Sequence, residues 1–293
     1  MERNRRPSEN GSLWKVMLVI FFVAAIIGAA VTVVQIRRQN QAEERLEQLA
    51  ESVRAREEEQ TPSAETSEAA KEDPPQETPA ARETEEDPLQ VLEEMGIPIP
   101  EKEIDFAQLQ EEVNPDIYAW IYIPDTQIDY PVLQHPTDNL YYLEYNLDGS
   151  RGYPGCIYTE DYNEKDFSDP NTVIYGHNMK NGTMFAGLHK FEDIEYFEEH
   201  PYVYIYTEEK LFVYEIFAAY ESGNEHILYN NDFTSEYVYA KYLENLFSMR
   251  AMNCNRKENV TVTTENRIVT LSTCVANKSD RRYLVQGVLL NED

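Results

Sequence analysis

The chain contains 293 residues, of which 25 are Lys or Arg and 54 are Asp or Glu, so its formal net charge is −29 at pH 7. This excess of negative charge argues against a protein that binds nucleic acid, because binding to phosphates requires a basic surface. The length and the 42% hydrophobic content allow one folded domain of roughly 150 to 200 residues together with less compact segments. The scattered carboxylates predict a solvated acidic surface.

An uncharged, mainly apolar run at residues 16–36 is long enough to span a membrane. About 20 apolar residues cover the roughly 30 Å hydrocarbon core, and Trp14 and Lys15 lie where interfacial anchors are found. A cleaved secretory signal is the alternative, but its apolar region usually has only about 7 to 15 residues, and no small-residue cleavage motif follows this run. We therefore expect an uncleaved anchor. The positive-inside rule favours residues 1–15 in the cytoplasm and the body of the chain outside.

Two segments follow the anchor and precede the folded domain. Residues 37–60 predict a helical, solvated stalk, with Leu46, Leu49 and Val53 on one narrow stripe among glutamates. Residues 61–104 are rich in Glu, Thr, Ser, Ala and Pro and predict an acidic, mostly disordered linker. A flexible linker of this kind holds a folded head some tens of Å from the bilayer. We place the folded domain at residues 105–293.

The folded domain opens with a short helix that Phe106, Leu109 and Val113 predict and that Asn114 and Pro115 end. Short runs rich in Val, Ile, Tyr and Thr then predict strands separated by turns. These runs cover residues 117–123, 127–132, 155–159, 172–175, 202–207, 211–220, 259–263, 267–273 and 282–290. Helices are expected near residues 139–145, 184–191 and 233–251. Many short strands with few helices predict a mainly β fold, a closed or nearly closed β-barrel with helical insertions.

The three cysteines have different surroundings in the sequence. Cys156 and Cys254 fit small packing roles, buried or half-buried. Cys274 instead ends the apolar strand IVTLSTC and precedes the polar loop VANKSDR, where a side chain is fixed and yet reachable. Cys274 is therefore the candidate nucleophile, and it would need a proton-transfer partner and a group that stabilises an oxyanion.

His177 is the candidate proton-transfer partner, because it alone of the histidines follows an apolar strand, TVIYG, and precedes a turn. The other histidines are expected at the surface: His135, His189, His200 and His226. From the residues alone, a Cys–His pair and two unrelated loop residues both remain open.

A cationic side chain follows shortly after Cys274, where Arg282 begins the last predicted strand. A short loop would return it beside the thiol. Because side chains alternate along a strand, only one of Arg281 and Arg282 points inward, and the period does not say which. Two solvated arginines that balance an acidic domain are the alternative.

Three segments, TVIYGHNMKNGTMF, TLSTC and the terminal RYLVQG, in that order, resemble the sortases, the membrane-anchored cysteine transpeptidases of Gram-positive bacteria. Class B is favoured by TLSTC, by AWIYIPDTQIDYPVLQ near the start of the domain, and by a long helix between the sixth and seventh strands. The resemblance covers roughly residues 105–290. It implies a closed barrel of about eight strands with an N-terminal helix.

The resemblance also implies roles for individual residues. Cys274 matches the nucleophile, His177 the general acid and base, and Arg282 the side chain that orients substrate and stabilises the oxyanion. It further implies a substrate-binding set: Ser272, Thr273, Asn139 and Leu143. The sequence departs from better-known members in a short loop before Arg282 and in Val275, where an acidic residue often follows the cysteine. These departures concern substrate preference rather than the chemistry.

The implied reaction has two substrates. The thiolate attacks a threonine carbonyl in a C-terminal sorting motif of a secreted protein, and an amine of peptidoglycan or of a pilin resolves the resulting thioester. Neither a cofactor nor a metal ion is expected, because no Cys/His cluster has zinc spacing and no glycine-rich phosphate loop occurs. The expected location is the cell membrane, with a single span and the catalytic domain on the extracellular face.

Two other functions stay open from the sequence. A cell-wall L,D-transpeptidase also combines cysteine, histidine and arginine, but its glycine-cysteine signature with a nearby upstream histidine is missing here. A membrane-tethered display module that has kept the barrel without catalysis would predict an unreactive Cys274.

Overall fold

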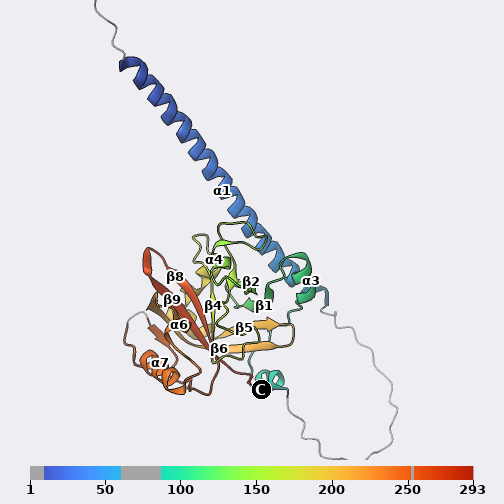
Figure 1. Ribbon diagram of the computed structural model, residues 1–293. Coiled ribbons are helices and arrows are strands. Elements are labelled where there is room, and N and C mark those ends of the chain that lie inside the picture. The colour runs from blue at the N-terminus through green and yellow to red at the C-terminus, as the bar shows by residue number, and fades with distance from the viewer. Residues whose placement is uncertain (1–9, 61–86, 252–253, 293) are drawn as a thin grey trace, which may run out of the picture.

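The computed structural model describes residues 10–60, 87–251 and 254–292 (Figure 1). The helices of this part are α1 (Asn10–Gln60), α2 (Pro88–Glu94), α3 (Phe106–Glu112), α4 (Tyr141–Glu144), the 3₁₀ helix η1 (Phe185–Glu192), α5 (Ile194–Glu199), α6 (Ile227–Asn230) and α7 (Glu236–Ser248). Its strands are β1 (Ile117–Tyr122), β2 (Asp129–Leu133), β3 (Ile157–Tyr158), β4 (Asn171–Tyr175), β5 (Tyr202–Thr207), β6 (Leu211–Gly223), β7 (Cys254–Arg256), β8 (Ile268–Val275) and β9 (Lys278–Leu289).

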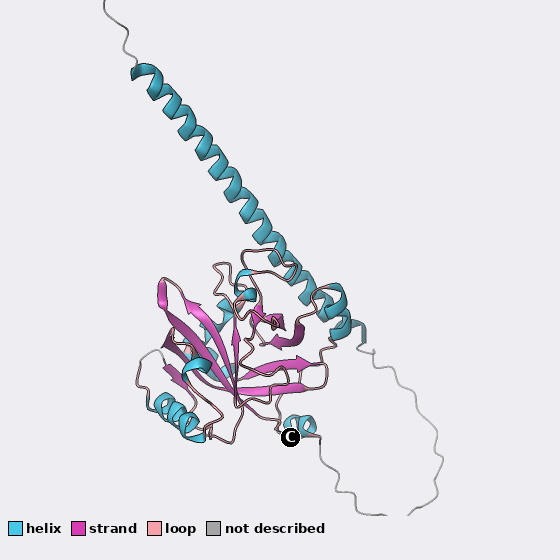
Figure 2. Cartoon of the chain, viewed as in Figure 1, coloured by secondary structure: helices cyan, strands magenta, loops and turns pink. Residues whose placement is uncertain are grey.

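Within the described part of the chain, eight strands close into a mixed barrel (Figure 2). Their order around the sheet is β5, β1, β2, β3, β4, β8, β9 and β6, and β6 pairs back with β5. The β2–β3 and β4–β8 pairs are parallel. The short strand β7 adds to the far side of β6. The predicted mainly β, closed-barrel fold with a helix before it is confirmed, and α7 lies between the sixth and seventh strands as expected.

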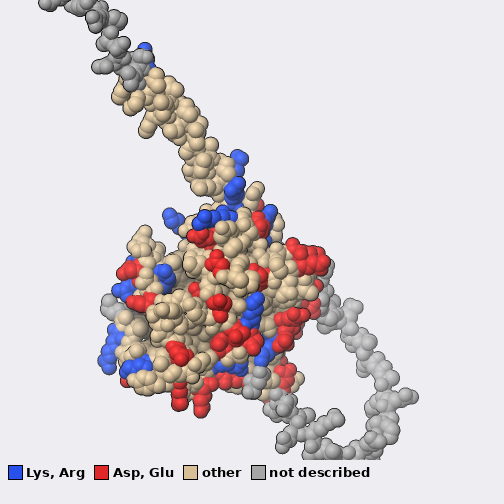
Figure 3. Space-filling view, in the orientation of Figure 1, with Lys and Arg blue, Asp and Glu red and all other residues tan. Residues whose placement is uncertain are grey.

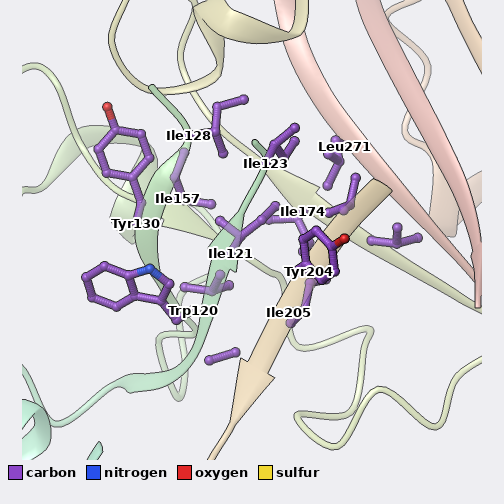
Figure 4. Packing of buried hydrophobic residues seen from close by; sticks show 14 of the residues in the cluster. Trp120, Ile121, Ile123, Ile128, Tyr130, Ile157, Ile174, Tyr204, Ile205 and Leu271 are labelled. Carbon is purple, nitrogen blue, oxygen red and sulfur yellow. The ribbon is translucent and has the colours of Figure 1, made fainter. Parts of the chain in front are cut away.

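The barrel interior is filled by apolar side chains from facing strands (Figure 4). Ile121 of β1, Ile174 of β4 and Leu271 of β8 have no measurable exposure. Close packing of this kind penalises any shift of one strand against its neighbour. The core therefore holds β4 and β8 side by side and fixes where their ends lie.

One predicted strand is wrong. Residues 259–263 form no strand, and Cys254–Arg256 pairs with β6 instead. Val260 and Val262 pack against the apolar cluster beneath α7, which also contains Leu243 and Leu246. The apolar residues of this run therefore serve packing rather than strand pairing. The helix expected at residues 184–191 forms as a 3₁₀ helix, while α2, α5 and α6 were not predicted.

The second half of α1 departs from the expected solvated stalk. Leu46, Ala50 and Val53 are buried and belong to the same cluster as the barrel core. Arg54 Nε donates to Asp129 Oδ2 on β2 at 2.8 Å. The predicted stripe thus faces the barrel rather than water.

The linker was predicted to cover residues 61–104, but the last part of this range is folded. Residues 61–86 lie outside the described part, but α2 follows directly, and Leu92 and Ile97 are buried in the core. The Tyr206 hydroxyl on β5 donates to the carbonyl of Pro100 at 2.8 Å. The folded part therefore begins before residue 105.

The first half of α1 is an exposed apolar helix, long and apolar enough to cross a membrane, with a mean hydropathy of 2.9 in its most apolar window. Figure 3 shows this uncharged length, with basic side chains where it meets the barrel. Ile36 ends the apolar run and Ala42 is the first buried residue of α1, a separation of about 9 Å at the rise of an α-helix. If α1 spans a bilayer, α1 and not the linker sets the distance between the barrel and the membrane.

Candidate active site

The ends of two parallel strands bring the candidate nucleophile and its proton-transfer partner together. Tyr175 of β4 is paired with Ser272 of β8, and the Gly176 N–H donates to the Ser272 carbonyl at 3.1 Å. Parallel strands end at the same edge of a sheet, so His177 and Cys274, each two residues further on, leave the barrel next to each other.

Antiparallel pairing brings in the candidate cation. Cys274 lies directly opposite Arg282 in the β8–β9 pair. Arg282 and Leu284 line the same groove as Cys274, whereas Arg281 Nε lies 3.8 Å from Glu221 Oε1. Because side chains alternate along β9, the side chain of Arg282 lines the groove and that of Arg281 does not.

The connection between β8 and β9 is tighter than the predicted loop VANKSDR. β8 continues to Val275 and β9 begins at Lys278, so only Ala276 and Asn277 form the turn. Asn277 has φ 61°, a left-handed conformation that asparagine tolerates better than most residues. This short hairpin restricts how far Arg282 can move from Cys274.

His177, Cys274 and Arg282 all line one groove of about 210 Å³. Three of the predicted substrate-binding residues, Leu143, Ser272 and Thr273, line it as well. The Thr273 hydroxyl is engaged within the protein, since it donates to the Gly176 carbonyl at 2.8 Å. In residues 10–60, 87–251 and 254–292, no group of three or more His, Cys, Asp and Glu side chains is arranged to hold a metal ion.

Asn139 lies outside the residues that line the groove. Its Nδ2 donates to Asp161 Oδ1 at 2.5 Å, and its Oδ1 accepts the Asp161 N–H at 2.8 Å. The following residue, Leu140, lines the groove instead. Asn139 thus joins the segment before α4 to the segment after β3.

The His177 ring is held on several sides. Its Nε2 lies 2.8 Å from the Leu143 carbonyl, which can only accept, so Nε2 carries a proton in this arrangement. The Tyr153 ring meets it edge to face at 5.0 Å between centroids. Gly155 has φ +68°, and a Cβ there would lie 2.7 Å from the Tyr142 carbonyl. A glycine is therefore required for the chain to pass this close to the Tyr142 carbonyl, beside the His177 ring.

The cysteines differ in exposure as the sequence predicted. Cys274 is exposed, Cys254 is half-buried and Cys156 is buried. Burial raises the pKa of the Cys156 thiol. Burial also raises the pKa of Cys254, and the nearby Arg256 opposes this shift by lowering it. Cys274 is thus the thiol that combines access with a position in the groove.

Sequence reasoning missed a close contact between a histidine and a glutamate in the groove. His226 Nε2 lies 2.7 Å from Glu160 Oε2, and both residues line the groove. His226 Nδ1 accepts the Tyr229 N–H at 3.0 Å, so the proton of a neutral ring lies on Nε2, the nitrogen nearer the carboxylate. Burial raises the pKa of Glu160, and His226 opposes this shift. The two residues lie in separate polar loops, and no local pattern in the sequence relates them.

The four histidines expected at the surface, His135, His189, His200 and His226, are half-buried rather than fully exposed. The side chains of His189 and His200 are 22% and 19% exposed. His200 and His226 have carboxylate partners that are distant in sequence, whereas Glu192 lies three residues after His189.

A closed mixed barrel with an apolar N-terminal helix holds a thiol, an imidazole and a guanidinium in one groove, the set of groups that acyl transfer through a cysteine requires. The family model described as "Sortase domain" matches residues 121–290, more than half of the chain, and the chain belongs to the sortase family.

Known relatives place it in class B. Sortase B of Listeria monocytogenes is 35% identical over 184 residues, which are 62% of this chain and 73% of the relative. Sortase B of Staphylococcus aureus is 31% identical over 166 residues, 56% of this chain and 65% of the relative. The solved structure of Clostridium perfringens sortase B is similar with a TM-score of 0.56 at 31% identity, covering 62% of this chain and 98% of that one.

Proposed function

We propose that Cys274, His177 and Arg282 are the catalytic residues of a transpeptidase that cleaves a C-terminal sorting motif of secreted proteins at a threonine carbonyl. The observation that carries this proposal is that His177, which is distant in sequence, lines one groove with Cys274 and Arg282, and that Cys274 lies directly opposite Arg282. Membership of the sortase family supports the same reaction class.

The first half of the reaction forms an acyl-enzyme. Cys274 Sγ, as thiolate, bonds to the threonine carbonyl carbon, and the carbonyl oxygen becomes an oxyanion that faces Arg282. A charge-assisted contact of this kind stabilises the transition state by a few kcal/mol in a groove that excludes water. His177, as imidazolium, gives its proton to the departing amine while the C–N bond breaks. The products are a thioester on Cys274 and the released C-terminal peptide.

The second half transfers the acyl group. A primary amine of peptidoglycan, or of a pilin lysine, attacks the thioester carbonyl, and His177 now accepts the proton that the amine loses. The C–S bond breaks and a new amide forms. The thioester keeps the acyl group activated between the two steps, so no external energy source is needed.

The groove offers contacts for the peptide on both sides of the thiol. Leu143 is partly exposed and lines the groove beside His177, and Ser272 lies two residues before Cys274 on β8. We assign Leu143, Ser272 and Thr273 to the wall that the sorting peptide contacts. Asn139 would act on the peptide only indirectly, because Asp161 engages both ends of its amide.

The apolar half of α1 supports a membrane arrangement. Its apolar half would span the bilayer once, with the preceding residues in the cytoplasm and the barrel on the extracellular face. In this position the groove meets secreted proteins and cell-wall amines close to the membrane.

The test uses the full chain in detergent micelles with labelled peptides that contain a threonine and with a small primary amine as acceptor. We expect transfer of the label by the wild-type chain and none by Cys274→Ala or His177→Ala, with unchanged far-ultraviolet circular dichroism. Unchanged transfer by Cys274→Ala would overturn the proposal, and absence of transfer with every peptide would favour a display module.

A further inference from the structure

A cluster outside the groove lining converges on the main-chain carbonyl of Cys274. Asn178 Nδ2 donates to this carbonyl at 2.9 Å. Asn178 directly follows His177, so a single amide joins the strand ends that carry His177 and Cys274. His189 Nε2 lies 2.9 Å from Asn178 Nδ2 and 3.1 Å from the same carbonyl.

His189 is itself held firmly. Its Nδ1 lies 2.6 Å from Glu192 Oε1, one turn further along η1. Its ring stacks on Tyr283, with centroids 4.9 Å apart and planes 26° from parallel. Tyr283 follows Arg282 and pairs with Thr273 on β8. The His189 imidazole therefore contacts the residue after His177, the residue after Arg282 and the carbonyl of Cys274 itself.

The donors and acceptors of the cluster form a consistent chain. Glu192 accepts the Nδ1 proton of His189, which leaves Nε2 of the neutral ring as an acceptor. One proton of the Asn178 amide then goes to His189 Nε2 and the other to the Cys274 carbonyl. Asn178 therefore holds the Cys274 peptide, and His189 fixes the amide of Asn178.

We propose that His189, fixed by Glu192, is a positioning residue that acts through Asn178 to hold the Cys274 peptide beside His177. Neither Asn178 nor His189 lines the groove, so they act on the reacting atoms only through Cys274. This proposal rests on the proposed function of Cys274 and His177. A displacement of about 1 Å at a reacting group can cost roughly 100-fold in rate, so a small shift of this peptide would be measurable.

The test compares His189→Ala, Asn178→Ala and the double variant in the transfer assay on the full chain. We expect each single variant to lower kcat by about 10- to 100-fold with KM changed less than about 2-fold. Because His189 acts through Asn178, the double variant should be no slower than Asn178→Ala alone. His189→Gln should recover part of the rate, because its amide oxygen can accept from Asn178.

His200→Ala is the matched control. His200 is a half-buried histidine that stacks on Tyr196 at 3.8 Å between centroids, with Nε2 3.4 Å from Asp125 Oδ2, and it does not line the groove. We expect this variant to lower Tm about as much as His189→Ala does, with kcat unchanged. Equal kcat for His189→Ala and wild type, or additive losses in the double variant, would overturn the proposal.

A second readout does not depend on the proposed function. Iodoacetamide alkylates thiolates, and mass spectrometry of the peptides reports the rate at Cys274 alone. We expect His189→Ala to change this rate at neutral pH at least about 3-fold, because a displaced Cys274 peptide moves the thiol relative to His177 and the groove, and His200→Ala to leave it unchanged. An unchanged rate in His189→Ala would overturn the positioning role even if no peptide substrate were turned over.

Discussion

At the scale of single residues, two arginines that are adjacent in the sequence have different positions, and only one of them lines the groove. Arg282 lies opposite Cys274 and lines the groove, while Arg281 lies beside Glu221. A guanidinium that faces the developing oxyanion acts in the transition state, whereas one in a surface ion pair contributes little. The two residues therefore form a natural pair of test and control.

We expect Arg282→Ala to lower kcat for peptide transfer by about 100- to 1,000-fold, the usual effect of removing one oxyanion donor. Arg281→Ala should stay within about 3-fold of wild type, because its side chain points away from the groove. Steady-state transfer rates of both variants check this. Equal losses would mean that Arg282 has no special place in the reaction.

Glu160 gives a prediction about pH. Burial raises its pKa above the ordinary value of 4.5, against the lowering effect of His226. The folded state therefore binds this proton more tightly than the unfolded chain, so the stability it contributes is complete below pH 4.5 and is lost as the pH rises through the folded-state pKa.

Glu160→Gln keeps a neutral side chain at every pH. We expect its Tm to match wild type near pH 4 and to exceed it increasingly toward pH 7, measured by calorimetry at both values. Tyr175, Asp161 and His226 also act on this carboxyl group, so Tyr175→Phe serves as a control that keeps the charge. A Tm difference that is constant with pH, or that shrinks as the pH rises, would contradict the assignment.

At the scale of elements, the second half of α1 is part of the folded domain. Its stripe of Leu46, Ala50 and Val53 is buried against the barrel, and Arg54 reaches Asp129 on β2. Asp129 also accepts from Trp120 Nε1 at 2.7 Å. The second half of α1 is thus held on the barrel by an apolar contact and by the ion pair between Arg54 and Asp129.

Leu46→Ala should weaken this contact by about 2 to 3 kcal/mol, the lower range for a buried leucine. Glu51→Ala, on the exposed side of the same helix, should have no effect beyond about 0.5 kcal/mol. Limited proteolysis of residues 41–56 in the full chain reports detachment of the helix. Equal cleavage of both variants would show that α1 is not docked in solution.

Several elements could be predicted because their sequences carry local patterns. The strands that became β1, β4, β5 and β8 are dense runs of Val, Ile, Tyr and Thr, and the helix α7 has a regular apolar face. β7 was missed because Cys254–Arg256 has no such composition and forms a strand only through its pairing with β6. The contacts of His189 with the Cys274 carbonyl and of His226 with Glu160 join segments distant in sequence, so only the folded chain reveals them.

At the scale of the whole molecule, the long helix α1 runs from its exposed apolar half directly onto the barrel (Figures 1 and 3). Only a few residues separate the end of the apolar run from the first buried position, Ala42. Residues 61–86 connect the end of α1 to α2, and Val53 and Leu92 on either side of them both lie in the same core. The linker was predicted as the spacer because its composition is plain in the sequence, whereas the docking of α1 depends on a barrel surface that no local pattern describes.

This arrangement gives a paired prediction. A flexible Gly-Ser segment of about ten residues inserted after Arg38 should reduce anchoring of a client protein to the wall in cells. The reason is that the distance between the barrel and the membrane would no longer be fixed by a continuous helix. The same segment inserted within residues 61–86 should not. Both variants should transfer soluble peptides at the wild-type rate. Equal anchoring by the two variants would contradict a fixed height set by α1.

The formation of a thioester on Cys274 is the central claim, and mass spectrometry of the intact full chain tests it most directly. After mixing with a sorting peptide in the absence of an acceptor amine, we predict a mass increase equal to the acyl fragment, mapped to the peptide that contains Cys274 and lost on addition of hydroxylamine. An adduct on Cys156 or Cys254, or the same adduct on the Cys274→Ala variant, would contradict the account.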